Sequence, residues 1–316
     1  MKLFLKETQS PGDILMLTST VRDLKKSHPE YQINCKTSAQ ELWNNNPYLD
    51  TSINESNADK IIEMHYPLIH RSTQGQFHFM HGFRLYAEEQ LGIKIPAGNF
   101  CVDVHLSEQE KNDPYILNIL NEIPKEKKVW LGDFGHKNDF TAKFWEHSRF
   151  QEVVNMTKDR IAWIQIGASN HVHKPIENVI NLVGKTTHRQ LISLMYRVDG
   201  VLTPVSYPMH LSTMQWYNHP DDHHRPCVVI AGSREPSIWE QYTCHQYIHN
   251  CGILPCSKRG ACWKSRVVKL NDGSKQDNSI CINPVTTQSG QVIPKCLDLI
   301  TVDEVVRKIH LYLDNM

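Results

Sequence analysis

A carboxylate follows a tight turn near the start of the chain. The residues Ser10-Pro11-Gly12-Asp13 have turn chemistry, because glycine accepts backbone angles that other residues avoid, and apolar residues at helical spacing follow over residues 14–24. An Asp at the start of a helix can cap its free N–H groups. The same short carboxylate can instead take a proton from a hydroxyl group as a general base. The sequence alone leaves both interpretations of Asp13 open.

Two lysines further along the chain are candidates for stabilising negative charge. Lys143, in the run Lys143-Phe144-Trp145, could neutralise the charge that develops on a departing phosphate, and Lys137 is a nearby competitor. The alternative interpretation is a solvated surface lysine, which is what most lysines are.

The segment Ser206–Leu211 has features of an anion site. A helix predicted near Met209 would direct backbone N–H groups at a phosphate, with Ser206 and His210 as the best-placed side chains. His210 can equally be a packed histidine within an apolar run.

Four of the nine cysteines fall in a loop-like stretch rich in Gly, Lys, Asp and Asn. They are Cys256, Cys262, Cys281 and Cys296. Four thiolates could enclose one tetrahedral zinc or iron ion, and a full set leaves no open position, so the metal would be structural. Because there is no CxxC pair, unlinked thiols are the alternative, and Cys244 or Cys251 could substitute for one of the four. No catalytic metal is expected, since no Asp-x-Asp element is present.

The elements that would position these residues alternate between strand and helix. Seven apolar runs predict short buried strands with helices between them: residues 3–5, 31–35, 129–131, 161–166, 181–183, 200–202 and 227–231. This order predicts parallel sheets, in an α/β fold with two Rossmann-like domains facing a cleft. We expect the polar stretch 107–128 to join a domain of residues 1–120 to one of residues 121–316. The second domain would contain a Cys-rich insertion near 251–296 and end in a helix over 303–313.

Composition limits the kinds of partner. The chain has 316 residues, and its 34 Lys and Arg balance its 34 Asp and Glu. This balance gives no positive support for nucleic-acid wrapping or membrane-surface binding. The N-terminus has no apolar stretch long enough for a signal peptide, and no segment could span a bilayer, so we expect a cytoplasmic protein. The 18 histidines show no metal-ligand spacing.

Four blocks in order give the chain a family resemblance. They are Gly12–Met16 leading to a helix that ends at Pro29, Asn181–Thr187, Ser206–Leu211 and Ala231–Trp239. The chain resembles the family 9 glycosyltransferases, the ADP-heptose heptosyltransferases, over nearly its whole length. The resemblance implies the GT-B arrangement, with the acceptor in the first domain and the nucleoside diphosphate sugar in the second. It also implies inverting transfer with Asp13 as the base. The implied donor contacts are Gly12, Lys143, Ser206, Met209 and His210.

The resemblance extends to the acceptor side and to the cysteines. His81 and Arg84 could hydrogen-bond a sugar or a phosphate of the acceptor, although an amphipathic core helix explains the segment 78–84 equally well. The four-cysteine stretch is similar to an iron-binding finger of heptosyltransferases that modify autotransporter proteins.

One departure from the family pattern affects the donor. Val205 and Tyr207 stand where the heptosyltransferases carry an acidic residue and a glycine, and the acidic residue is associated with the donor. A heptose donor, ADP-linked, therefore competes with a UDP-linked pentose or hexose, transferred to a protein, a small metabolite or a modified DNA base. A third interpretation is a non-catalytic nucleotide- or sugar-binding protein with a structural metal finger.

Overall fold

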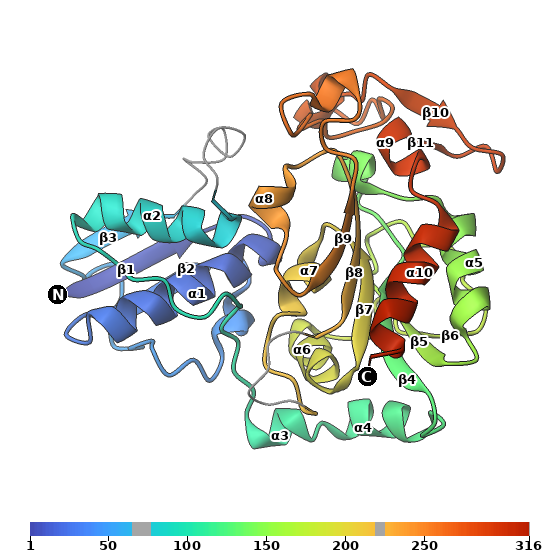
Figure 1. Cartoon of the computed structure of the whole chain (residues 1–316). Helices are drawn as coiled ribbons and strands as arrows, with labels where there is room; N and C mark the ends of the chain where they lie inside the picture. Colours follow the sequence, from blue (N-terminus) through green and yellow to red (C-terminus); the bar gives the residue numbers. More distant parts are fainter. Residues whose placement is uncertain (65–76, 219–224, 316) are drawn as a thin grey trace.

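The chain forms two parallel sheets and one short antiparallel pair of strands (Figure 1). The computed structural model describes residues 1–64, 77–218 and 225–315. The first sheet has the strand order β2-β1-β3, and the second has the order β6-β5-β4-β7-β8-β9. Helices accompany both sheets, which confirms the predicted α/β fold with two Rossmann-like units.

The first unit is built around strand β1. Its elements are β1 (Lys2–Glu7), α1 (Pro11–Ser27), β2 (Gln32–Thr37), the 3₁₀ turn η1 (Gln40–Trp43), β3 (Lys60–Glu63) and α2 (Phe79–Leu91). β1 pairs with both other strands, and its residues Leu3, Phe4 and Leu5 are buried. α1 and α2 pack against each other beside this sheet (Figure 1). The strand–turn–helix order places the first turn of α1 just after the carboxyl end of β1.

The second sheet has the strand order of a nucleotide-binding fold. Its strands are β4 (Lys128–Asp133), β5 (Ile161–Ile166), β6 (Val179–Asn181), β7 (Gly200–Pro204), β8 (Cys227–Gly232) and β9 (His245–His249). All of them are parallel, and in chain order they are arranged 3-2-1-4-5-6. The order reverses between β4 and β7, where Trp130 pairs with Gly200. Ligands of such sheets bind outside the carboxyl ends of the strands at this switch point.

Alternate side chains of the second sheet enter two different cores. The helices that cover it are α5 (His147–Thr157), α6 (His188–Arg197), α7 (Tyr207–Leu211) and α10 (Val302–Leu313). Trp130 of β4 belongs to the core on the side of α5 and α10. Leu131, the next residue, belongs to a core that continues through α6 and α7 into the first unit. The two units therefore share one apolar core, which fixes how they sit together.

The connection between the two units lies against the second unit. Its helices are α3 (Glu108–Lys111) and α4 (Pro114–Asn121), and both pack on α6 (Figure 1). Arg189 of α6 donates two hydrogen bonds to the carboxylate of Glu110, at 2.6 and 2.8 Å. The neighbouring His188 pairs with Glu41 of η1. Helix α6 thus contacts both the connection and the first unit.

Most of the remaining elements belong to the part of the chain that contains Cys256, Cys262, Cys281 and Cys296. The remaining elements are α8 (Ser237–Glu240), η4 (Pro255–Ser257), η5 (Lys275–Asn278), the antiparallel pair β10 (Pro284–Thr286) and β11 (Val292–Pro294), and α9 (Lys295–Asp298). They gather at the end of the second sheet that carries the carboxyl termini of β8 and β9 (Figure 1). In the parts of the chain that the structure describes, no helix is both long and apolar enough to cross a membrane.

The close approach of β4 and β7 generates a prediction for Gly200→Ala. A Cβ atom at residue 200 would lie 2.3 Å from the ring of Trp130, which is fully buried. We expect the substitution to lower the free energy of unfolding by about 2 kcal/mol, because a close-packed core cannot accept the added methyl group. Chemical denaturation measures this value. In a Trp130→Leu background the same substitution should cost much less, and an equal cost in both backgrounds would contradict the packing argument.

Candidate active site

Asp13 lies on the first turn of α1, and its carboxylate is anchored on one side. Ser10 is the N-cap residue of α1, and its backbone N and its Oγ both donate to Oδ2 of Asp13, at 2.9 and 2.8 Å. Asp13 is therefore the N3 residue of a capping box, in which its carboxylate accepts a hydrogen bond from the backbone of the N-cap residue. Among the described residues, no donor approaches Oδ1, so the second carboxylate oxygen is left for a ligand.

Burial sets the protonation of Asp13. The side chain is mostly buried, which raises the pKa of this carboxyl to about 6, although the Ser10 hydrogen bonds and the cations Lys143 and Lys137 lower it. Both lysines come from the second unit, so the carboxylate of the first unit faces cations of the second. At neutral pH Asp13 is mainly ionised, with a pKa suited to accepting a proton.

Lys143 and Arg234 form the cationic side of the site. Lys143 ends the 3₁₀ segment η3 (Asn138–Lys143), and its Nζ lies 2.7 Å from Oε1 of Glu235. Arg234 pairs with the same carboxylate oxygen and lies over the ring of Phe140, 4.8 Å from its centroid. Burial favours neutral Glu235, but the two cations outweigh this effect and lower its pKa. One carboxylate therefore balances two cations, which leaves a net positive charge available to an anion.

The switch point of the second sheet carries a carboxylate and a hydroxyl. Asp133 ends β4, and Ser206 follows β7. Ser206 Oγ donates to Oδ2 of Asp133 at 2.8 Å and is also 2.8 Å from Oγ1 of Thr203. Burial raises the pKa of Asp133 to about 6, against the opposing effect of its hydrogen bonds. Lys143 donates to the carbonyl of Val205 at 3.4 Å, so the cations and the switch point form one continuous site.

Gly12 and His210 bring the two units into contact at this site. A Cβ atom at residue 12 would lie 3.6 Å from Cδ2 of His210 on α7, which is an ordinary van der Waals distance. Burial lowers the pKa of His210 well below its usual value, and the imidazole is therefore neutral. The first turn of α1 thus packs directly on α7.

A chain of neutral polar groups crosses between the units beside Asp13. Oη of Tyr242 lies 3.1 Å from Nδ1 of His210 and 3.4 Å from the sulfur of Met16. Nε2 of His210 lies 3.5 Å from Oε2 of Glu240. Burial, followed by the charges of Glu235 and Asp13, raises the pKa of Glu240 well above its usual value. Glu240 is therefore neutral and brings no further negative charge next to Asp13.

The structure brings together most of the residues that the sequence singled out. Gly12, Asp13, Lys143, Ser206 and His210 all lie around the contact between α1 and α7. Met209 is fully buried and Lys137 is exposed near Asp13.

The proposed acceptor residues have other partners. Arg84 donates to Glu88 at 2.9 Å and to the carbonyl of Ile95 at 2.7 Å, both within the first unit. His81 stacks on the ring of Phe100, with centroids 5.5 Å apart. None of these contacts connects His81 or Arg84 to the cluster around Asp13.

Residues of the site that were not singled out from the sequence include Asp133, Arg234, Glu235, Glu240 and Tyr242. The available signal for Asp133 was its place at the end of the first predicted strand of the second domain, since ligands bind at such ends. Glu235 lies in the block Ala231–Trp239 that carried the family resemblance and Glu240 follows that block, but nothing in their spacing showed that they are buried.

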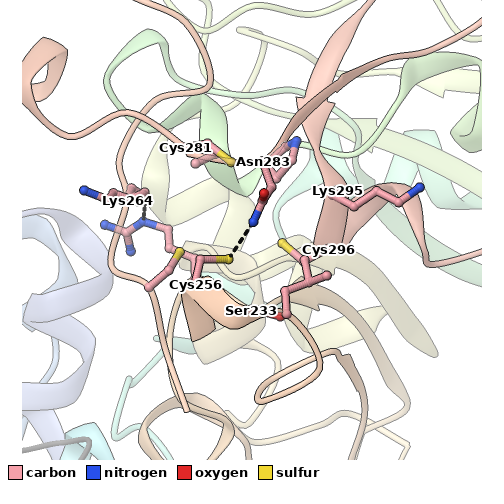
Figure 2. A pocket seen from close by; sticks show the side chains of 12 residues that line it. Ser233, Cys256, Lys264, Cys281, Asn283, Lys295 and Cys296 are labelled. Carbon is pink, nitrogen blue, oxygen red and sulfur yellow. Dashed lines mark hydrogen bonds between the residues drawn. The ribbon is translucent and has the colours of Figure 1, made fainter. Parts of the chain in front are cut away.

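Four thiols line a small cavity next to this site (Figure 2). They are those of Cys256, Cys262, Cys281 and Cys296. The cavity volume is about 10 Å³, which is the space of a single water molecule or ion. Asn283 donates to the sulfur of Cys256 at 3.3 Å (Figure 2). Among the described residues, no three His, Cys, Asp or Glu side chains are already arranged as a ligand set, so ligation would require these thiols to rotate inward.

The two substitute cysteines lie outside the cavity. Cys251 donates its thiol to the carbonyl of Glu235 at 3.3 Å, and the carbonyl of Cys244 accepts from Tyr312. Neither residue lines the cavity.

The whole chain is similar in structure to solved glycosyltransferases. The glycosyl transferase family 9 protein from Veillonella parvula DSM 2008 matches with a TM-score of 0.69 at 14% identity, over 100% of this chain and 98% of that one. ADP-heptose lps heptosyltransferase II of E. coli matches with a TM-score of 0.59 at 15% identity, over 100% and 99%. The dodecameric iron-containing heptosyltransferase TibC of enterotoxigenic E. coli, in complex with ADP-D-beta-D-heptose, gives 0.62 at 14%, over 99% and 76%.

These matches confirm the GT-B fold and, at the level of structure, the resemblance to family 9 glycosyltransferases. No protein-family model matches the sequence, and no curated protein matches it.

The electrostatic coupling between the units generates a prediction for Lys143→Ala. Removing this cation should raise the pKa of Asp13 above its value of about 6, because a nearby positive charge favours the ionised carboxylate. Carboxyl-detected NMR titration measures the change. Lys137→Ala should raise it less, since Lys137 is the weaker influence. An Asp13 that titrates identically in the Lys143 variant and the unmodified protein would show that the two residues do not face each other.

Proposed function

We propose that the protein is a glycosyltransferase that moves a sugar from a nucleoside diphosphate to an acceptor hydroxyl. The observation that carries the proposal is the meeting of an ionisable carboxylate from one unit, Asp13, with the cations Lys143 and Arg234 from the other. These groups lie beside the switch point of a nucleotide-binding sheet. Their chemistry fits the two charges that sugar transfer must handle, a proton on the acceptor and a negative leaving group.

In the proposed reaction, Asp13 accepts the proton of the acceptor hydroxyl as its oxygen attacks the anomeric carbon. The bond from that carbon to the diphosphate breaks, and the electron pair leaves with the nucleoside diphosphate. A single displacement of this kind inverts the anomeric centre. Lys143 and Arg234 stabilise the charge that develops on the departing diphosphate, with Glu235 holding both cations in place.

The donor sugar is assigned to the switch point. Ser206 and Asp133 offer a hydroxyl and a carboxylate, which suit sugar hydroxyl groups. We favour a heptose-type donor linked to ADP, because structures similar to this chain include WaaC of E. coli with ADP and TibC with ADP-D-beta-D-heptose. The valine at residue 205 supports the alternative of a UDP-linked pentose or hexose, since it removes an acidic group from the end of β7. The acceptor of either reaction is a hydroxyl of a saccharide, a protein, a metabolite or a nucleic-acid base.

The four-cysteine cavity is proposed as a structural metal site. The chemistry of the donor set fits zinc or iron, because four thiolates are the ligands of a closed tetrahedral site, and the thiols that line the cavity would rotate inward to hold the ion. Cys256, Cys262, Cys281 and Cys296 would hold it. Such an ion would supply folding free energy to the loops around it. No step of the transfer requires it.

The general-base assignment predicts the behaviour of Asp13→Asn. We expect kcat to fall by about 10²- to 10⁴-fold, which is the usual contribution of a general base. In the unmodified protein the rate should fall as the pH drops through about 6, because protonated Asp13 cannot accept a proton. The measurement is release of nucleoside diphosphate from ADP- and UDP-linked sugars as a function of pH.

Nucleotide binding provides the control for this variant. Melting temperatures measured with ADP, UDP, GDP, CDP and TDP should show the same selective rise in the Asp13→Asn variant as in the unmodified chain, since Asp13 belongs to the acceptor side. Unchanged turnover in the variant would exclude Asp13 as the base. If no nucleotide raises the melting temperature of either protein, the non-catalytic interpretation becomes the one to pursue.

The metal site predicts about one zinc or iron ion per chain by elemental analysis of the purified protein. Cys281→Ser should lower this content and the melting temperature, because the ion is bound by the native fold. Cys251→Ser is the matched control and should retain the ion, since Cys251 lies outside the cavity. Loss of metal only in the control variant would show that the ligand set is wrong.

A further inference from the structure

The chain that follows Cys262 is hydrogen-bonded to the loop that carries Arg234. The backbone N–H of Cys262 donates to the carbonyls of Ser233 and Arg234, each at 3.2 Å, and that of Trp263 donates to Arg234 at 2.9 Å. In return, Nε of Arg234 donates to the carbonyl of Lys264 at 2.7 Å. Four hydrogen bonds therefore fix the backbone and the guanidinium of Arg234 against one short segment.

The same segment is hydrogen-bonded to η3, which ends at Lys143. The N–H of Ala142 donates to the carbonyl of Ser265 at 3.0 Å, and the N–H of Val267 donates to Oγ1 of Thr141 at 3.0 Å. The residues Cys262–Val267, here called the strap, thus contact the carriers of both cations. The strap contains neither cation itself.

The strap is anchored at both ends. At its start, Cys262 lines the thiol cavity. The other three cysteines of the cavity, Cys256, Cys281 and Cys296, are labelled in Figure 2. At its other end, the buried guanidinium of Arg266 pairs with Asp272 at 2.7 Å and with Asp277 at 2.5 Å. The N–H of Cys281 donates to the carbonyl of Arg266 at 2.7 Å. This hydrogen bond links the Arg266 end of the strap to Cys281, which lines the cavity.

The backbone of the strap adopts a conformation that its sequence does not favour. Trp263 has a φ of 55°, in the left-handed region of backbone angles that residues other than glycine rarely adopt. Such a conformation persists when the surrounding contacts determine it. Here the contacts are the hydrogen bonds to residues 233 and 234 and the position of the indole 5.9 Å from the guanidinium of Arg234. The strap therefore depends on its anchors to keep this shape.

We propose that the strap is a positioning element for Lys143 and Arg234, and that an ion in the four-cysteine cavity anchors it. The cavity lies next to the cations but contributes nothing to the reaction, so its effect passes through the backbone of residues 262–267. An ion bound in the cavity would fix the position of the strap. The strap in turn positions Lys143 and Arg234, which bind the diphosphate. The proposal rests on the proposed function for the identity of the bound anion.

Hydrogen exchange on the full chain tests the anchor without any assay of activity. The protein is loaded with zinc(II), or stripped with a chelator, and its metal content is confirmed in each state. In the stripped state, we expect the amides of Ala142, Cys262 and Trp263 to exchange about tenfold faster or more, because their hydrogen bonds belong to the strap. The amides of β1 in the first unit should not change, which serves as the internal control.

A substitution outside the cysteines and the cations tests the positioning. Thr141→Val removes the oxygen that accepts from Val267 but keeps the shape of the side chain, and Thr141→Ser is the matched variant that keeps the oxygen. We expect the dissociation constant for ADP or UDP, and the KM for the donor, to rise about fivefold in Thr141→Val, with metal content unchanged. The kcat should fall as well, because the same cations stabilise the departing diphosphate. Thr141→Ser should restore the values of the unmodified protein.

Each remaining outcome decides a distinct part of the proposal. Failure to take up zinc or iron overturns the ion as anchor, and so does unchanged exchange at Ala142 and Trp263 after the metal is removed. Unmodified nucleotide affinity in Thr141→Val overturns the positioning role. If the strap amides respond to metal but no nucleotide binds in any state, the strap is retained and the proposed transferase function fails instead.

Discussion

The site depends on the packing of the first turn of α1 directly on α7. Gly12 lies on this turn, and His210 of α7 lies opposite it, 3.6 Å from the position of a Cβ atom at residue 12. The shared apolar core behind this contact holds the two sheets at a fixed separation. As a result, a carboxylate at the end of β1 faces cations that come from the loops after β4 and β8. Asp13 comes from the first unit and both cations come from the second, so this pairing of charges requires the two units to be in contact.

Burial then determines which of the charged groups carry charge. Glu235 is held ionised by two cations, whereas burial raises the pKa values of Asp13, Asp133 and Glu240. Because burial keeps Glu240 neutral, the site is less negative than its composition suggests. An anion such as a diphosphate can therefore approach Lys143 and Arg234. Burial also lowers the local dielectric constant, which strengthens the electrostatic interactions between the groups that remain charged.

The sequence predicted the parts of the structure that depend on local chemistry. The turn at residues 10–13 and the apolar strands have signals within a few residues, and the placement of Asp13, Lys143 and His210 near one another followed from the family resemblance. Asp133 was missed because its meeting with Ser206 requires β4 and β7 to pair across about seventy residues of chain. Arg84 is a different case, since the structure pairs this residue with Glu88, four residues later in the same helix. A single sequence does not show which distant residues come together, or whether a charged side chain is already paired with a neighbour.

The most direct test of the account is a crystal structure of the protein with the nucleoside diphosphate that binds it most tightly. The account predicts that the diphosphate lies between the carboxyl ends of β4 and β7, with its oxygens on Lys143 and Arg234, and that the carboxylate of Asp13 faces it from the first unit. A nucleotide bound elsewhere on the chain, with Lys143 still paired only to Glu235, would contradict the assignment of this contact between the units as the active site.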